Sequence, residues 1–391
     1  MNIVYLGAFR FPNCDAAAAR VLNIGKALRD CGHQVTFISW GGHYNEEHLI
    51  STGVYYTNGF RYIITNELDS GNNFISKFRG RLLRGNKTKK LLTHWPERID
   101  VIITYNGSIN RWLLSFCQSH RIKLINDITE WYSYSEMKIS EWIPYIWKML
   151  FTQKSVKNKI VISSYLDRFY SSSHNVVVPA TCDATDSKWS NSSWTEHSEL
   201  ADFDGITLIY AGNPARKDLL HKEINVVQRL INDGVAIRFL ILGITREQYL
   251  SHYSSLLLDD NPNKNIIFLG RVSQDSIPSF YRKSDFMVLL RENSRKSNAG
   301  FPTKFSEAII SGTPVIANLT SDLRLYLIDG LTGFVVKEPN EDALYATLKE
   351  KVLSMSREQI QQMKQNAYLI SEKLDYHFYV DTLRKYMAEL R

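Results

Sequence analysis

Residues 299–318 carry the side chains that are best suited to bind a phosphate group. They follow an apolar run at residues 285–290 that has the length of a strand, and they lead into a helical pattern of apolar residues. Thr303 and Lys304 stand where that helix begins, so a hydroxyl group and a positive charge join the unpaired N–H groups of a helix N-terminus. The carboxylate of Glu307, one turn later, would repel a phosphate, so we expect it to accept hydrogen bonds from hydroxyl groups nearby. A diphosphate beside a diol indicates a nucleotide.

A second loop with similar properties follows the apolar run at residues 206–211. Gly212 ends this run, and Arg216 and Lys217 stand just before the next helical pattern. Both loops are expected to leave strand ends of one parallel sheet, which is where open α/β folds bind ligands. We therefore expect Arg216 and Lys217 to contribute to the same diphosphate site.

Short apolar runs alternate with helical patterns in both halves of the chain, which predicts a sheet covered by helices in each half. Residues 183–204 are rich in Ser, Thr, Asp and Trp and lack periodicity, as is typical of a linker. Residues 42–69 show little pattern, and residues 291–298 are interpreted as a polar loop. The expected strands cover residues 2–6, 35–38, 100–104, 123–126, 160–164 and 175–179 in the first half, and 206–211, 237–242, 265–270, 285–290, 315–317 and 330–336 in the second.

The end of the first expected strand carries a further candidate site. Gly7 is expected to open a loop there, and the Ala residues at positions 16–19 allow another body to approach that loop closely. Arg20 then either reaches into this gap or lies solvated on a helix that packs against its own sheet.

Two acidic residues, Asp127 and Glu130, follow the expected strand at residues 123–126. At the carboxyl end of a strand, either carboxylate can take the proton from an incoming hydroxyl group, so this is the best candidate for the acceptor side of a reaction. Asp127 can also cap the helix that follows it.

Two segments of the first half combine basic and large apolar residues. Residues 74–95 contain seven Lys or Arg and no acidic residue among them, and residues 142–151 are rich in aromatic side chains beside Lys148 and Lys154. Both patterns are typical of contact with an anionic membrane. For the first segment the alternative is a solvated helix with its apolar side in the core, and RNA binding is disfavoured because no RRM-like strand is present. For the second, a core helix is an equal alternative.

Composition sets the remaining limits. The chain has 391 residues, 44% hydrophobic and 22% charged, as in ordinary globular domains, and its net charge of +7 favours a nucleotide, a nucleic acid or an anionic membrane as partner. The first residues lack the pattern of a signal peptide, and no apolar run approaches the roughly twenty residues that span a bilayer. The scattered cysteines predict neither a zinc site nor a disulfide framework and fit a reducing cytoplasm; they are Cys14, Cys31, Cys117 and Cys182.

Residues 299–318 resemble the signature of the family 4 glycosyltransferases, which are retaining enzymes with the GT-B fold. That signature has two Glu residues separated by seven residues, which span a Gly-Phe-Gly loop and a helix start. Glu307 and residues 311–316 match its second half closely. Ala299 stands in place of the first Glu, which usually contacts the transferred sugar, and Pro302 stands in place of the second Gly of the loop. The donor sugar is therefore left open.

The resemblance implies an α/β fold with two Rossmann-like β/α/β domains that face each other across a cleft. Residues 1–182 would bind the acceptor, residues 205–370 the nucleotide sugar, and a helix within residues 371–391 would cross back to the first domain. Arg271, after Gly270, resembles the Gly-Arg turn of these enzymes.

By the same resemblance, we expect a retaining glycosyltransferase that moves a sugar from a UDP or GDP sugar to a hydroxyl of a lipid-linked saccharide in cell-surface polysaccharide assembly. It would need no metal ion or nucleic acid, and it would work in the cytoplasm on the inner face of the membrane. The alternatives are a nucleotide-sugar epimerase on the same fold and a non-catalytic nucleotide-sugar-binding subunit, which the missing first Glu favours. The expected catalytic residues are Asp127, Glu130, Lys217 and Glu307, and the expected donor-binding residues are Gly7, Arg20, Gly212, Arg216, Lys217, Arg271, Gly300, Phe301, Thr303, Lys304 and Glu307.

Overall fold

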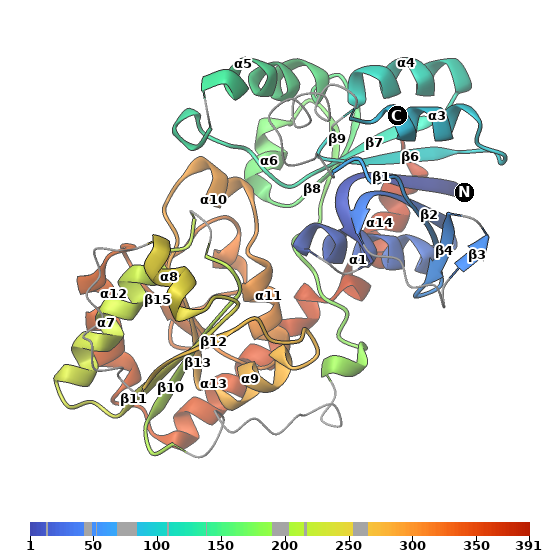
Figure 1. The fold of residues 1–391 in the computed structure, drawn as a ribbon. Helices are drawn as coiled ribbons and strands as arrows, with labels where there is room; N and C mark the ends of the chain where they lie inside the picture. Colours follow the sequence, from blue (N-terminus) through green and yellow to red (C-terminus); the bar gives the residue numbers. More distant parts are fainter. Residues whose placement is uncertain are drawn as a thin grey trace. The chain divides into compact units, whose positions relative to one another are not determined.

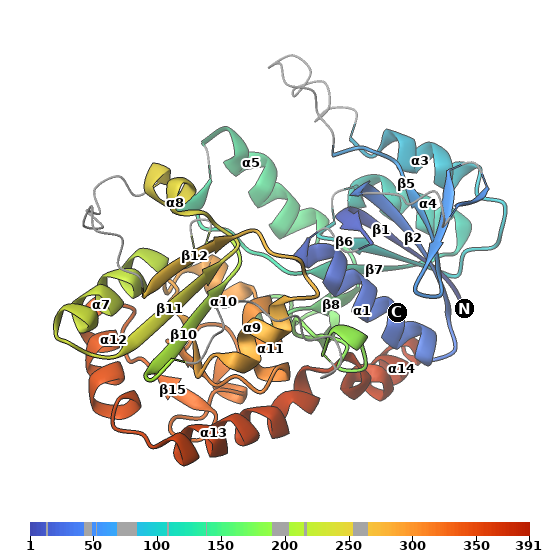
Figure 2. The ribbon, with the colours of Figure 1, turned by 60° about the horizontal axis from the view of Figure 1, so that its bottom comes forward.

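The chain divides into two compact units, which are described separately. The structure is a computed structural model that describes residues 1–12, 15–42, 49–51, 53–68, 84–107, 109–137, 139–189, 203–214, 217–252 and 265–391. The first unit comprises Met1–Cys182 together with Tyr376–Arg391, and the second comprises Asp183–Asp375. Figures 1 and 2 show their elements in two orientations.

The first unit is built on a nine-stranded sheet in the order β3-β4-β5-β2-β1-β6-β7-β8-β9. All neighbouring strands are parallel except at β4, which runs antiparallel to β3 and β5. Strands β3, β4 and β5 lie in the region that showed little sequence pattern; they are short, and β4 contains no buried residue. The strands are β1 (Asn2–Phe11), β2 (Gln34–Gly42), β3 (Leu49–Ser51), β4 (Val54–Thr57), β5 (Phe60–Ile64), β6 (Val101–Tyr105), β7 (Lys123–Ile128), β8 (Asn158–Val161) and β9 (His174–Val177).

Helices cover both faces of this sheet (Figure 1). Alternate residues of β1 point to opposite sides, so Ile3 and Tyr5 join a core with α1 and α14, whereas Val4 and Leu6 join a second core with α3 and α4. The C-terminal segment packs within this unit, where His174 stacks on Tyr386 with ring centroids 4.7 Å apart. The helices of the unit are α1 (Ala16–Asp30), α3 (Asn86–Thr93), α4 (Asn110–His120), α5 (Ile139–Trp147), its π-helical continuation η3 (Lys148–Thr152), α6 (Ser164–Phe169) and α14 (Val380–Ala388).

The second unit contains a parallel six-stranded sheet in the order β12-β11-β10-β13-β14-β15. Helices α7 and α12 pack together, and α9 and α13 both pack against α11. The strands are β10 (Ile206–Ala211), β11 (Ile237–Leu242), β12 (Ile266–Gly270), β13 (Phe286–Leu289), β14 (Val315–Ala317) and β15 (Gly333–Val335), and the helices are α7 (Leu220–Asn232), α8 (Arg246–His252), α9 (Ile277–Lys283), α10 (Arg295–Ala299), α11 (Thr303–Ile310), α12 (Glu341–Thr347) and α13 (Arg357–Leu369).

The prediction of an α/β chain with a mostly parallel sheet in each half is confirmed. Residues 291–298 are not simply a loop, because α10 forms there with the Ser294 side chain as its N-cap. In the part of the chain that the structure describes, no helix combines the length and apolar character needed to cross a membrane. Cys31, Cys117 and Cys182 are not in disulfide bonds, and Cys14 lies outside the described residues.

Candidate functional site

Two loops of the second unit meet where the strand order reverses. Because β10 lies between β11 and β13, the loops that leave the carboxyl ends of β10 and β13 start side by side. The N–H of Leu219 donates to the carbonyl oxygen of Leu290 at 2.8 Å, and the N–H of Glu292 donates to that of Lys217 at 3.3 Å. Main-chain hydrogen bonds therefore hold the two loops together.

Lys304, at the start of α11, lies against the loop after β10. Gly212 has φ +111°, and a Cβ added to it would come within 2.7 Å of Lys304 Cε. Lys304 Nζ also donates to the carbonyl oxygen of Asn213 at 3.3 Å. The structure thus brings together two predicted loops that lie some ninety residues apart in the sequence.

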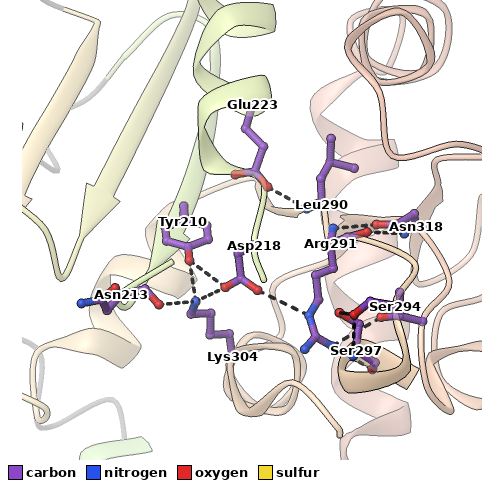
Figure 3. A network of polar contacts seen from close by, with 11 residues as sticks. Tyr210, Asn213, Asp218, Glu223, Leu290, Arg291, Ser294, Ser297, Lys304 and Asn318 are labelled. Carbon is purple, nitrogen blue, oxygen red and sulfur yellow. Dashed lines mark hydrogen bonds and ion pairs between the residues drawn. The ribbon is translucent and has the colours of Figure 1, made fainter. Parts of the chain in front are cut away.

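The ammonium group of Lys304 is fixed by two further partners (Figure 3). It is paired with the carboxylate of Asp218 and donates to the hydroxyl oxygen of Tyr210 at 2.5 Å. The Tyr210 hydroxyl donates in turn to Asp218 at 2.8 Å. With Asn213, these partners satisfy all three protons of the ammonium group, so its position is well defined.

Asp218 also approaches a second cation, Arg291, whose Nε lies 3.4 Å from the carboxylate. Both side chains are 2% exposed. Burial alone would raise the pKa of Asp218, but Lys304 and Arg291 outweigh it and hold this pKa below its ordinary value. One carboxylate between two cations leaves a net positive charge at the loop pair.

A buried acid, Glu223 on α7, supports the loop after β13. Its carboxyl group accepts the N–H of Leu290 at 2.6 Å, which fixes the residue before Arg291. Burial raises the pKa of Glu223 well above its ordinary value. Glu223 therefore favours its protonated, neutral form more than an ordinary Glu does.

Glu307 lies one helical turn beyond Lys304 and is only partly buried. Among the described residues, its carboxylate forms no hydrogen bond. Burial raises the pKa of this group, and the charges of Lys188 and Lys304 act in the opposite direction. A partly exposed carboxylate with free acceptor atoms is suited to receive hydroxyl groups of a ligand.

The residues just before α11 differ from the expected donor contacts. Phe301 is 6% exposed, and its ring packs against Tyr326 and Phe305 with centroids 5.6 and 6.1 Å away. Its side chain is part of the core, so a donor contact by Phe301, which stays a prediction, would have to come from its backbone. Ala299 is fully buried at the end of α10, and Gly300, with φ −84°, follows it without a left-handed turn.

Three other predicted donor residues of the second unit, Thr303, Lys217 and Arg271, follow the carboxyl ends of strands of this sheet. Thr303 is half-buried at the start of α11, whose N-terminus has no side-chain cap. Lys217 is half-buried next to Asp218, and Arg271 is exposed just after β12. Arg216 lies outside the described residues.

In the first unit, Asp127 and Arg20 form a buried ion pair at 2.7 Å, with exposed fractions of 0% and 4%. Tyr5 donates to the same carboxylate at 2.6 Å, and Arg20 donates to the carbonyl oxygens of Val178 and Pro179. Asp127 is therefore inaccessible to a substrate hydroxyl, and it caps no helix because it lies within β7. Arg20 neither enters a gap nor lies in solvent. These corrections follow because Arg20 on α1 and Asp127 on β7 neutralise each other in the interior of the unit.

The two remaining candidates of the first unit have different outcomes. Gly7 opens no loop, because β1 continues to Phe11; instead its backbone packs closely on β6, where an added Cβ would lie 2.9 Å from Tyr105 Cβ. Glu130 follows β7, is half-buried, and accepts the hydroxyl proton of Tyr132 at 2.6 Å. Glu130 is thus the acid of the expected pair that lies near the surface.

The membrane-like segments are partly described. Residues 74–83 lie outside the described residues. Helix α3 directs Leu92 into the core, which agrees with the alternative of a helix whose apolar side belongs to the core. In the aromatic segment, Met149 is buried, whereas Ile143 and Trp147 are exposed. One side of this helix is therefore core and the other is not.

Sequence reasoning missed the residues that position Lys304, namely Tyr210, Asp218, Glu223 and Arg291. Asp218 directly follows the predicted Lys217, so its charge was a usable signal, but its pairing depends on contacts distant in sequence. Within the described residues, no group of three or more His, Cys, Asp or Glu side chains is gathered to hold a metal ion. Metal independence stays a prediction.

Comparisons with known proteins find similarity to glycosyltransferases. Residues 195–370 match the family model described as glycosyl transferases group 1. A glycosyltransferase of Methanocaldococcus jannaschii is 30% identical over 171 residues, which cover 43% of this chain and 42% of the relative. A trehalose synthase of Thermococcus litoralis is 25% identical over 174 residues, which cover 42% of this chain and 40% of the relative. The match thus spans about two fifths of the length of these relatives.

Solved structures match the fold of the complete chain. Sucrose-phosphate synthase from Thermosynechococcus elongatus has a TM-score of 0.74 at 14% identity and covers 100% of this chain and 99% of its own. Anabaena HepE in complex with UDP-glucose has a TM-score of 0.68 at 14% identity and covers both chains completely. The GT-B fold class predicted from the sequence is confirmed.

Proposed function

We propose that the protein is a retaining glycosyltransferase that transfers a sugar from a nucleoside diphosphate sugar, bound by the second unit, to a hydroxyl of a saccharide acceptor. The observation that carries this proposal is the fixed position of Lys304 beside Gly212, at the edge where the strand order reverses. Further support comes from the family match over residues 195–370 and from the UDP-glucose complex of a protein with the same fold.

The leaving diphosphate is the group that this site would stabilise. Lys304 and Arg291 share one carboxylate, so their combined charge favours an anion. The longest of the three Lys304 contacts is the one to Asn213, at 3.3 Å, and a phosphate oxygen can replace it while Asp218 and Tyr210 keep the ammonium group in place. The uncapped start of α11 at Thr303 and the side chain of Lys217 would add further donors.

Glu307 would bind the ribose of the nucleotide. It lies one turn from Lys304 and keeps free acceptor atoms at the surface, so two adjacent ribose hydroxyls can donate to it while the phosphates contact the helix start. Arg216 and Arg271 are proposed to contact the same donor.

On the acceptor side, Glu130 would take the proton of the incoming hydroxyl, since Asp127 is engaged inside the sheet. We further propose that the acceptor is lipid-linked and that the reaction belongs to cell-surface polysaccharide assembly at the inner membrane face, without a metal ion. The net charge of +7 and the exposed apolar side chains of α5 support a membrane partner.

The test combines donor binding with product analysis. A thermal-shift panel of UDP, GDP and their sugars should identify the base, and incubation of the matching donor with a membrane lipid extract should yield a glycosylated product whose anomer matches the donor. Lys304→Met should abolish transfer, whereas Lys337→Met, at an exposed lysine of the same unit, should not. Isomerised donor without acceptor would indicate an epimerase, and binding without turnover would indicate a non-catalytic subunit. Either result would overturn the proposal.

A further inference from the structure

A cavity of about 610 Å³ lies within the first unit, between α3, the start of α4 and α5. In Figure 1 these three helices lie along the same side of that unit. Four basic side chains line the cavity together with two tryptophans, and none of the described residues in its wall is acidic. The basic residues are Arg84, Lys89, Arg111 and Lys148, and the tryptophans are Trp112 and Trp147.

These four cations lack an ion-pair partner among the residues that the structure describes. Within the described part of the chain, none of the four forms an ion pair, and the buried Nε of Arg84 has no hydrogen-bond partner. A buried guanidinium N–H without an acceptor is unfavourable, so Arg84 points to a missing anionic partner. The start of α4 adds to the positive potential, because Ile109 and Asn110 line the cavity and this helix has no side-chain N-cap.

Lys148 is the cation whose charge depends most on a partner. Burial lowers its pKa to about 8, and the charge of Glu130 opposes this shift. The Lys148 ammonium also lies 5.9 Å from the ring centroid of Tyr145. An anion in the cavity would keep this ammonium group protonated.

An apolar stripe borders the cavity on α5 and η3. We define it as Ile143, Trp147, Leu150 and Phe151, which are 79%, 58%, 40% and 54% exposed and recur at helical spacing. Trp147 belongs both to the stripe and to the cavity wall. The other side of this helix is anchored by buried Met149, so the stripe is an outward face.

We propose that this cavity binds the phosphate group of a membrane lipid while the apolar stripe enters the hydrocarbon of the bilayer. Four cations without an ion-pair partner in the described part of the chain, beside an exposed apolar face, match the two parts of a phospholipid-like amphiphile. The inference deepens the acceptor side of the proposed function, because it assigns a lipid-phosphate site to the unit expected to hold the acceptor. It does not depend on the donor site.

Vesicle sedimentation without any sugar donor tests this site separately from transfer. The full chain should pellet with phosphatidylcholine vesicles that contain phosphatidic acid and should stay in solution with phosphatidylcholine alone. Arg84→Ala with Arg111→Ala should weaken the partition coefficient about tenfold or more, since each basic residue contributes to binding at an anionic surface. Lys123→Ala with Lys157→Ala removes the same charge from two exposed positions, the first residue of β7 and the residue before β8, and it should leave pelleting unchanged.

Two further arms distinguish the lipid from a free anion. Ile143→Ser with Phe151→Ser should reduce pelleting but keep the part of the pyrophosphate thermal shift that Arg84→Ala with Arg111→Ala removes, because these two stripe residues lie outside the cavity wall. Circular dichroism and melting temperature check that each variant folds. Equal loss of pelleting in the Arg84/Arg111 and Lys123/Lys157 double variants would show that the vesicles attract the protein's positive charge without a specific site. A pyrophosphate thermal shift that depends on Arg84 and Arg111, with no vesicle binding, would show a site for a soluble anion. Either outcome overturns the proposal.

Discussion

The ammonium group of Lys304 and the carboxylate of Asp218 form an ion pair across two loops of the second unit. Asp218 simultaneously lies 3.4 Å from Arg291 Nε, so a single buried carboxylate fixes the cation at the start of α11 and the residue that follows β13. A lysine that must meet a diphosphate is thereby held in place before the ligand arrives, which lowers the conformational entropy lost on binding.

Asp218→Asn should therefore destabilise the second unit strongly. The substitution leaves Arg291 buried without its counter-charge, and such changes typically cost about 3–5 kcal/mol. Urea unfolding measures the loss. Asp329→Asn is the matched control, because Asp329 pairs with Lys351 at the surface, where a pair contributes about 1 kcal/mol or less. Similar losses in the two variants would show that the buried Asp218 pair contributes no more to stability than a surface ion pair.

Gly212→Ala should separate crowding at Lys304 from backbone strain. Any side chain at Gly212 is strained at φ +111°, by about 1–3 kcal/mol, and its Cβ would also press on Lys304. Gly234→Ala supplies the control, because Gly234 has φ +81° and a Cβ added there would meet nothing within 4 Å. We expect similar stability losses in both variants but weaker donor binding in Gly212→Ala alone, as measured by titration calorimetry. Equal donor affinities would show that the Gly212 contact does not position Lys304.

Much of the second unit could be predicted from the sequence, because its strands are continuous apolar runs. β10 and β11 have the bounds that were expected. Strands β3 to β5 were not predicted, because each has only three to five residues and β4 contains no buried residue.

The site was predictable in its charged loop residues but not in their partners. Lys304 and Gly212 were identified from loop chemistry, whereas Arg291 appeared as an ordinary polar residue. Its burial follows from pairing with Asp218, which only the folded chain creates. Asp127 illustrates the same limit: β7 is longer than its apolar run because Arg20 neutralises the acid at the end.

Removing the charge of Asp127 should lower stability, whereas removing the charge of Glu130 should lower turnover. Asp127→Asn leaves Arg20 buried without a counter-charge, so we expect a loss of stability of about 3–5 kcal/mol. Glu130→Gln keeps an acceptor for the Tyr132 hydroxyl and should change stability by no more than about 0.5 kcal/mol. Its turnover should fall roughly 10²–10⁴-fold if Glu130 is the proton acceptor. A stable but inactive Asp127→Asn variant would show that Asp127 takes part in the reaction and is not only a structural residue.

Glu307 should make donor binding depend on pH. Burial raises the pKa of its carboxyl group, so this group becomes protonated at a higher pH than an ordinary Glu as the solution is acidified. The protonated form accepts ribose hydroxyls more weakly, and donor affinity should fall as the pH drops through this raised value. Glu307→Gln should lower affinity roughly 10–100-fold at neutral pH, the equivalent of about 1.5–3 kcal/mol for hydrogen bonds to a charged group, and should remove the dependence.

Stability should change in the opposite direction, which separates the two effects. A folded-state pKa above the unfolded value means that the Glu307 contribution to stability is fully present below the unfolded pKa and is lost as the pH rises through the folded pKa. Glu307→Gln should therefore be as stable as the natural protein, or more stable, at pH 7, although it binds donor more weakly. Melting temperatures and donor titrations between about pH 3.5 and pH 8, a range that brackets the ordinary Glu value of about 4.3, test both expectations. A variant that loses stability and affinity together would show that Glu307 serves the fold and not the ribose.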